Sequence, residues 1–184
     1  MKKASLYLAV VAALASALFL AVPGGSGQTG QERLWRSRNL GKALFETPTT
    51  ASEAPAELKK ALDLAPDSFR DRLNYGLSLL RAGEADQAIV ELGKAQAQDP
   101  KSPYTWFNLG IAYKRQGQTA DAIREFERMV QLAPDEPVSH YNLGLLLSDA
   151  LHRSTAAATQ FKLALALNPL DTVSQDALKQ LTGR

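Results

Sequence analysis

Side chains capable of covalent or metal chemistry are scarce in this chain. The 184 residues include two histidines and no cysteine, which excludes disulfides, thiolate zinc sites, iron–sulfur clusters and cysteine nucleophiles. His140 and His152 are not spaced as a zinc-binding helix requires, and no glutamate completes such a pattern between them. A Gly-x-Ser-x-Gly nucleophile motif does not occur. The sequence therefore indicates a non-catalytic protein with no metal or cofactor.

Charged side chains are balanced and spread along the chain. The sequence has 21 Lys and Arg residues against 19 Asp and Glu residues, a formal charge of +2. Carboxylates such as those of residues 121–127 are typical of a solvated face and a helix start rather than of a catalytic pair. Nucleic acid is not an expected partner, because its binding needs a larger basic stripe than this chain offers. The densest basic group, interpreted as a solvated face or a membrane-proximal flank, consists of Arg33, Arg36, Arg38 and Lys42.

The first thirty residues have the order of an export signal. Lys2 and Lys3 precede a charge-free apolar run from Leu6 to Val22, and a Gly-rich tract follows. This order is typical of a secretory signal peptide cleaved before Gln28, although a site within the apolar run fits as well. An uncleaved anchor is the alternative, because the run is at the lower limit for spanning a bilayer.

We therefore expect residues 1–27 to be a signal peptide, or an N-terminal membrane anchor, with its linker. The type of leader indicates a bacterial protein that is periplasmic or secreted, or else anchored in the inner membrane and facing the periplasm. Any contact with a membrane is expected only through this segment. Removal of Lys2 and Lys3 leaves 21 − 2 = 19 basic residues against 19 acidic ones, so the mature protein is expected to carry no net charge.

A short motif recurs at a fixed interval in the rest of the chain. Asn-Tyr-Gly or Asn-Leu-Gly stands at residues 74–76, 108–110 and 142–144, 34 residues apart each time, and prolines recur at 66, 100, 134 and 169. Apolar residues such as Leu73, Leu77 and Leu80 fall at helical spacing. The period-two alternation of strands is not found. The pattern predicts pairs of helices joined by short turns.

The period and its marks resemble those of the tetratricopeptide repeat (TPR). The central copy matches every position of that pattern, at Trp106, Leu109, Gly110, Tyr113, Ala122, Phe126 and Pro134. The resemblance implies an all-α fold, a right-handed superhelical solenoid of antiparallel helix pairs. Four units are expected over residues 31–169: a degenerate one at 31–66, then 69–102, 103–136 and 137–169. Residues 170–184 are expected to form a capping helix and tail, with apolar residues at Leu170, Val173, Ala177, Leu178 and Leu181.

Glycines inside the first helices indicate close approach of the two helices of a unit. Gly76, Gly110 and Gly144 each cost about 1 kcal/mol relative to alanine at a helix interior, so their recurrence needs a packing reason. Small residues of the second helices are expected to face them, at Ala88, Ala122 and Ala157.

Glycines just after the first helices predict left-handed turns. Gly83 and Gly117 stand where a helix ends and a left-handed residue is favoured. The last unit has no glycine there, and His152 is expected to take that turn position, a packing role rather than a chemical one.

The resemblance also implies a binding site. In TPR proteins the first helices of successive units line a concave groove that holds a peptide or helix of a partner. Carried over by position, this peptide-binding groove consists of Arg70, Leu73, Leu77, Tyr104, Phe107, Asn108, Ile111, Lys114, Val138, Tyr141, Asn142 and Leu145, with Arg38 and Lys42 in the first unit. The alternative for the apolar members is burial by neighbouring helices.

Three further expectations concern the first helices. An asparagine recurs at residues 39, 74, 108 and 142, either stabilising its own helix pair or bonding a ligand backbone, with Asn108 and Asn142 favoured for the ligand. Trp106 and Leu109 are expected to face the packed interior. Leucines at 73 and 77 occupy places where chaperone-binding TPRs carry a carboxylate clamp, so that clamp is not expected.

We interpret the chain as an exported, non-enzymatic adaptor that binds a protein segment in an apolar and aromatic groove. The alternative is a structural scaffold or self-associating module, because residues 60–66 and 73–77 also resemble the TPR module at the front of some large secreted bacterial proteins. Either a monomer or weak self-association is compatible with the sequence.

Overall fold

The computed structural model describes residues 29–149 and 152–183, and in these ranges every regular element is helical. Four helix pairs follow one another: α2 (Gly30–Glu46) with α3 (Ala54–Leu64), α4 (Phe69–Ala82) with α5 (Ala85–Gln98), α6 (Pro103–Arg115) with α7 (Thr119–Leu132), and α8 (Pro137–Asp149) with α9 (Ser154–Leu167). A last helix, α10, spans Thr172–Thr182, and a 3-10 turn, η2 (Ala51–Glu53), precedes α3. The leader expected at residues 1–27 lies outside the described residues. None of the described helices combines the length and apolar character needed to cross a bilayer.

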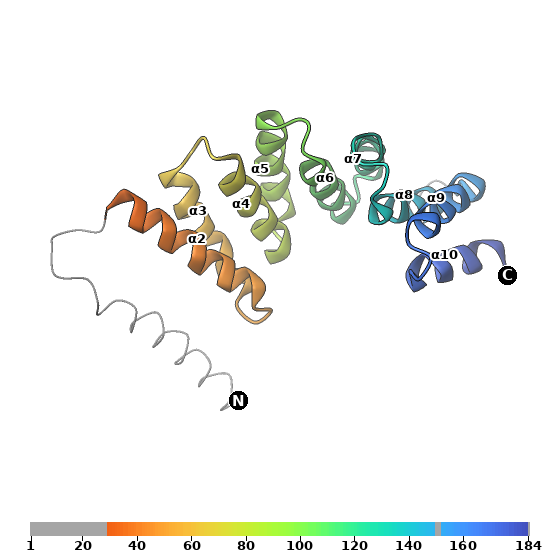
Figure 1. The fold of residues 1–184 in the computed structure, drawn as a ribbon, viewed down its shortest axis with the longest axis horizontal. Coiled ribbons are helices and arrows are strands. Elements are labelled where there is room, and N and C mark those ends of the chain that lie inside the picture. Colours follow the sequence, from red (N-terminus) through yellow and green to blue (C-terminus); the bar gives the residue numbers. More distant parts are fainter. Residues whose placement is uncertain (1–28, 150–151, 184) are drawn as a thin grey trace, which may run out of the picture.

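The helices stack in chain order, each beside the next (Figure 1). The most extensive contacts join the two helices of a pair, and each second helix then packs on the first helix of the following pair. First helices of neighbouring pairs also touch, α2 with α4, α4 with α6 and α8 with α10, whereas second helices make at most marginal contact with one another. Because the first helices are the closer set, they form the inner side of the stack.

Each helix pair closes around a glycine of its first helix. A Cβ atom placed on Gly76 would lie 2.8 Å from the Leu92 side chain, and one on Gly110 would lie 2.8 Å from Phe126. A Cβ atom on Gly144 would lie 2.7 Å from Phe161. All three distances are shorter than real Cβ contacts. Gly41 has the same relation to Leu58, at 2.6 Å. We call Gly41, Gly76, Gly110 and Gly144 the notch glycines. The predicted close approach is confirmed.

The partner of each notch glycine differs from the expected one. Ala88, Ala122 and Ala157 are fully buried, but the side chain that fills the notch is the large apolar residue four positions later. A leucine or phenylalanine enters because a missing Cβ leaves room for a whole side chain, and dense packing favours filling it.

The predicted turn conformations are also present. Gly83 and Gly117 follow α4 and α6 with φ of 89° and 70°, and His152 has φ 52°. Among the described residues, His152 is thus the one non-glycine residue with a positive φ, and it takes the left-handed turn before α9.

A repeated hydrogen bond ties α4, α6, α8 and α10 each to the loop before it. The carbonyls of Pro66, Pro100, Pro134 and Pro169 accept from the side chain six residues later, at Arg72, Trp106, His140 and Gln175. Trp106 was expected in the interior, yet it is only half-buried, because its indole N–H reaches the Pro100 carbonyl at 3.1 Å. Its ring lies 5.7 Å from the Arg128 guanidinium, whereas Leu109 is buried as expected.

The α10 helix closes the stack with one apolar side. Ala177, Leu178 and Leu181 pack against the α8–α9 core, and the opposite side exposes polar residues such as Lys179. Leu170 and Val173 do not join this packing and are 86% and 53% exposed. Leu170 precedes the helix, and Val173 stands on its first turn, ahead of the turns that meet the core.

A pair of glycine substitutions tests the notch. Gly110→Ala should lower the free energy of unfolding by about 1–2 kcal/mol, because the overpacking against the fully buried Phe126 exceeds the gain in helix propensity. Gly93→Ala in α5 meets nothing within 4 Å and should raise it by up to about 1 kcal/mol. Urea unfolding followed by circular dichroism measures both changes in the free energy of unfolding. Equal changes of the same sign would contradict the close contact between Gly110 and Phe126.

Candidate functional site

The residues predicted to form the groove lie on first helices, twelve of them on α4, α6 and α8, and Arg38 and Lys42 on α2. Their places are best described relative to the notch glycine. One row, which we call the leading row, stands six residues before each notch glycine and consists of Trp35, Arg70, Tyr104 and Val138. Val173 of α10 continues it, six residues before Lys179, which stands at the glycine position.

Three members of the leading row, Arg70, Tyr104 and Val138, are the exposed residues of the groove predicted on α4, α6 and α8. Tyr104 and Val138 are 67% and 43% exposed, and Arg70 is exposed between them and Trp35. Trp35 itself is 65% exposed. These side chains can contact a ligand without any rearrangement of the fold.

The middle rows, three before and one after the notch glycine, serve the core as well as the surface. Phe107 meets Phe126 edge to face with ring centroids 5.9 Å apart, and Tyr141 meets Phe161 at 6.0 Å. Leu73, Ile111 and Leu145 are likewise half-buried against the core, and Leu77 is half-buried. Neighbouring helices therefore cover one side of each of these residues, and the other side remains accessible.

Two of the recurring asparagines bond to their own helix. Asn108 Nδ2 donates to the Tyr104 carbonyl at 2.6 Å, and Asn142 Nδ2 donates to the Val138 carbonyl at 2.9 Å. These bonds support the interpretation that each asparagine stabilises its own helix. They engage the side-chain amides that the sequence analysis favours for contact with a ligand backbone. Asn142 is also buried.

The basic candidates of the groove differ in how far they are engaged. Lys114 is half-buried on α6. Lys42 is exposed and lies 3.7 Å from Glu46 on the same helix. Arg38 reaches from α2 to α4, where its Nε and Nη2 donate to Asp71 Oδ1 and Oδ2 at 2.8 and 2.5 Å. Arg38 therefore joins α2 to α4 and is not a free groove cation.

Asp71 is the buried partner of that ion pair. Burial raises the pKa of Asp71, but hydrogen bonds with Arg38 and Ser68 and the charges of Arg38 and Arg70 outweigh it, so the pKa lies below its usual value. The carboxylate is 1% exposed and stays charged at neutral pH, which makes the bidentate pair a fixed connection between the first two units.

A second electrostatic position recurs on the second helices. Glu91 of α5 accepts from Arg72 at 2.9 Å, and Gln160 of α9 lies 2.8 Å from His140 Nδ1. Glu125 of α7 instead receives a hydrogen bond from Gln96 at 2.9 Å. Burial raises the pKa of Glu125, although the Gln96 bond and the Arg124 charge oppose the shift.

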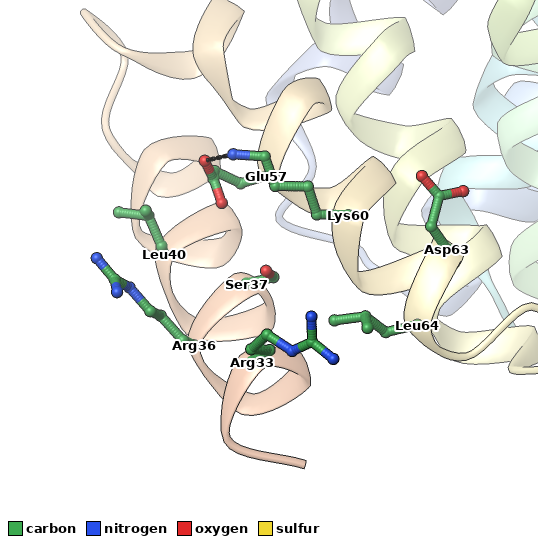
Figure 2. A pocket seen from close by; sticks show the side chains of 8 residues that line it. All are labelled: Arg33, Arg36, Ser37, Leu40, Glu57, Lys60, Asp63 and Leu64. Atoms are coloured by element: carbon green, nitrogen blue, oxygen red, sulfur yellow. Dashed lines mark hydrogen bonds and ion pairs between the residues drawn. The ribbon is translucent and has the colours of Figure 1, made fainter. Parts of the chain in front are cut away.

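Two hollows border the first unit, outside α4, α6 and α8. Figure 2 shows one of about 420 Å³ between α2 and α3, where Arg33 is directed toward the α3 side, Arg36 points away, and Lys60 bonds Glu57 at 2.6 Å. The other, of about 620 Å³, lies along α2 and includes Trp35 and Arg38. No group of three or more potential metal ligands exists in the described ranges.

Comparison with protein families decides what this architecture is. A family model described as Tetratricopeptide repeat matches residues 79–145, and a second model with the same description matches residues 51–103. The chain belongs to the tetratricopeptide repeat family. A comparison with curated proteins finds no match.

Solved TPR structures share the fold. The structure of MamA (residues 41 to the end) from Desulfovibrio magneticus RS-1 has a TM-score of 0.74 at 19% identity, over 83% of this chain and 85% of that one. YrrB, titled a TPR protein with an unusual peptide-binding site, gives 0.69 at 17% identity over 78% and 73%. The first TPR of Spaghetti (RPAP3), bound to an HSP90 peptide, gives 0.60 at 22% identity over 62% and 90%. These similarities establish an all-α TPR fold, the fold of a protein–protein interaction module.

Two members of the leading row were missed by the sequence reasoning. Trp35 was absent from the predicted groove because the first unit is degenerate, and Val173 was assigned to the packing of the capping helix. Counting six residues back from Gly41, and from Lys179 at the glycine position, would have found both.

Matched substitutions on the second helices test the electrostatics. Glu125→Gln should raise the free energy of unfolding at pH 7 by roughly 0.5–1 kcal/mol, because a neutral amide avoids burying charge and still accepts from Gln96. Glu91→Gln should lower it by roughly 1 kcal/mol, because it weakens the half-buried pair with Arg72.

The pH dependence gives the check on the sign. A carboxyl with a raised folded pKa costs stability only while it is ionised, so the gain from Glu125→Gln should shrink as the pH falls from 7 to about 4. Urea unfolding at both pH values measures it. A gain that is constant with pH would show that the charge of Glu125 is not its origin.

Proposed function

We propose that this TPR protein is a non-catalytic adaptor that binds a segment of a partner protein along the inner surface formed by its first helices. The observation that carries the proposal is the leading row: apolar and aromatic side chains, with Arg70 among them, recur at one position of successive first helices and remain exposed. Large exposed aromatic residues supply much of the energy of protein interfaces. The peptide-bound state of the Spaghetti TPR and the peptide-binding site named for YrrB support such a use of the fold.

The inner surface suits a ligand that adapts to a rigid receptor. The half-buried middle rows are held by aromatic contacts with the core, so little of the protein has to become ordered on binding. The proposed site therefore combines the leading row with the accessible sides of Leu77, Phe107 and Tyr141. Arg38 is excluded from it because Asp71 holds its guanidinium.

We place this activity in the periplasm or outside the cell, with anchoring in the inner membrane as the alternative. The support is the basic, apolar and Gly-rich order of residues 1–27. The N-terminal sequence of the protein recovered from a periplasmic fraction tests this, because an intact Met1 in the membrane fraction would favour the anchor.

Substitutions in the leading row should separate binding from folding. Tyr104→Glu places a charge on a side chain that is 67% exposed, so it should leave the thermal midpoint nearly unchanged while reducing recovery of a bound partner from an envelope extract by tenfold or more, a loss of about 1.4 kcal/mol. Phe107→Glu and Tyr141→Glu are less suitable, because both side chains also pack on the core. Quantitative mass spectrometry of the captured proteins measures the loss.

The matched control is Val90→Glu on the second helix α5. Val90 is 54% exposed, comparable to Tyr104, but lies off the inner surface. Equal loss of partner with both variants, or no loss with either, would contradict binding on the inner surface.

The alternative function is a self-associating scaffold. Leu163, Leu167 and Leu170 are exposed at 42%, 43% and 86% near the end of the stack, and such apolar side chains favour contact between copies. Light scattering should show a mass independent of concentration if the protein acts as an adaptor. A mass that rises with concentration and returns to that of the monomer in Leu170→Glu would instead favour the scaffold.

A further inference from the structure

The leading row has a chemical order that defines what it can recognise. Along the stack it runs Trp35, Arg70, Tyr104, Val138 and Val173, one side chain from each first helix and the last from α10. All five are exposed, and the four apolar ones are between 43% and 67% exposed. Single exposed apolar residues need no explanation, but recurrence at one repeat position produces a continuous strip.

Arg70 is the only charged member of this strip, and it makes no hydrogen bond or ion pair with the residues the structure describes. Other arginines near it are engaged: Arg38 holds Asp71, Arg72 holds Glu91, and Arg81 covers the Phe45 ring at 4.9 Å. Asp71, the acid nearest to Arg70 in sequence, already receives two bonds from Arg38. The charge of Arg70 is therefore available to a carboxylate from outside the chain.

The spacing of the strip sets the spacing of its ligand. First helices α2 and α4, and then α4 and α6, are in direct contact, and packed helices lie about 8–10 Å apart. Three residues of a polyproline II segment advance about 9 Å and complete one turn, so every third side chain lies on the same face. Successive members of the strip thus meet every third residue of a segment laid across the first helices.

We propose that the strip recognises a protein segment in the polyproline II conformation, in which an acidic residue lies three positions from an apolar residue on each side. The acidic residue pairs with Arg70, and the flanking apolar residues contact Trp35 and Tyr104. The pattern is the same in both chain directions. Trp35 also borders the hollow of about 620 Å³ along α2, which gives the first apolar side chain room beside Leu34. This inference rests on the proposed function, because it names the ligand of the same inner surface.

Selection from a displayed library of random peptides tests the pattern without knowledge of the natural partner. The purified protein, its Arg70→Glu variant and its Val90→Glu control are each used to select binders. The unmodified protein and the control should enrich the same acidic residue flanked by apolar residues at three-residue spacing. Arg70→Glu should enrich Lys or Arg at the central place instead.

Binding of one selected peptide, made synthetically with a fluorescent label, gives the quantitative test. Arg70→Glu should weaken it by roughly threefold to tenfold, and exchange of the peptide's acid for lysine should restore the affinity. If the selected peptides bind the Arg70→Glu variant as tightly as the unmodified protein but bind the Tyr104→Glu variant more weakly, this pattern is wrong, whereas the proposed function is supported. Failure of the unmodified protein to enrich any peptide would count against both.

Discussion

The close contact between one glycine and one large apolar side chain in each helix pair is the constraint on which the rest of the structure depends. Gly110 leaves no room for a Cβ beside Phe126, and Gly76 leaves none beside Leu92. The glycine costs about 1 kcal/mol of helix propensity, but complete burial of a leucine or phenylalanine contributes about 1.5–3 kcal/mol, so the exchange is favourable. Its repetition gives every pair the same crossing, and the same residue positions therefore face inward in each unit.

Apolar packing continues between units, since Leu109 of α6 shares a core with Leu79 and Leu92 of the preceding pair. One position of the first helices is instead filled by small or hydrogen-bonded polar groups. The position five residues before the notch glycine is almost completely buried in the later first helices, by Asp71, Thr105, Ser139 and, before Lys179, Ser174. Three of these are small hydroxyl residues, whereas Asp71 needs Arg38 to offset the cost of its buried charge. An ion pair of this kind contributes little net stability compared with an apolar pair. Its bidentate geometry instead fixes how the degenerate first unit sits on the second.

The repeated architecture was predictable because its signals are local. A glycine at a fixed interval, a proline at each unit boundary and helical apolar spacing predicted the helix pairs, and the left-handed conformation of His152 followed from the missing glycine. The notch partners were not predictable in the same way, because spacing alone does not tell whether Ala122 or Phe126 fills the space above Gly110. Trp106 departed from the expected interior because a hydrogen bond to the preceding loop held its indole at the surface.

The candidate site was harder to predict than the fold because exposure is set by tertiary packing. The spacing of the repeat predicted twelve groove residues on α4, α6 and α8 without ranking them. The core covers one side of Phe107, Ile111, Tyr141 and Leu145, so packing constrains the shape of these four side chains. A substitution there changes packing and binding together. The leading row makes no such contribution to the core, so its side chains are free to differ from unit to unit at little cost in stability. Partner selection is therefore expected to depend on Trp35, Arg70 and Tyr104 more than on the aromatic residues behind them, because only the former can change without altering the helix pairs that hold them.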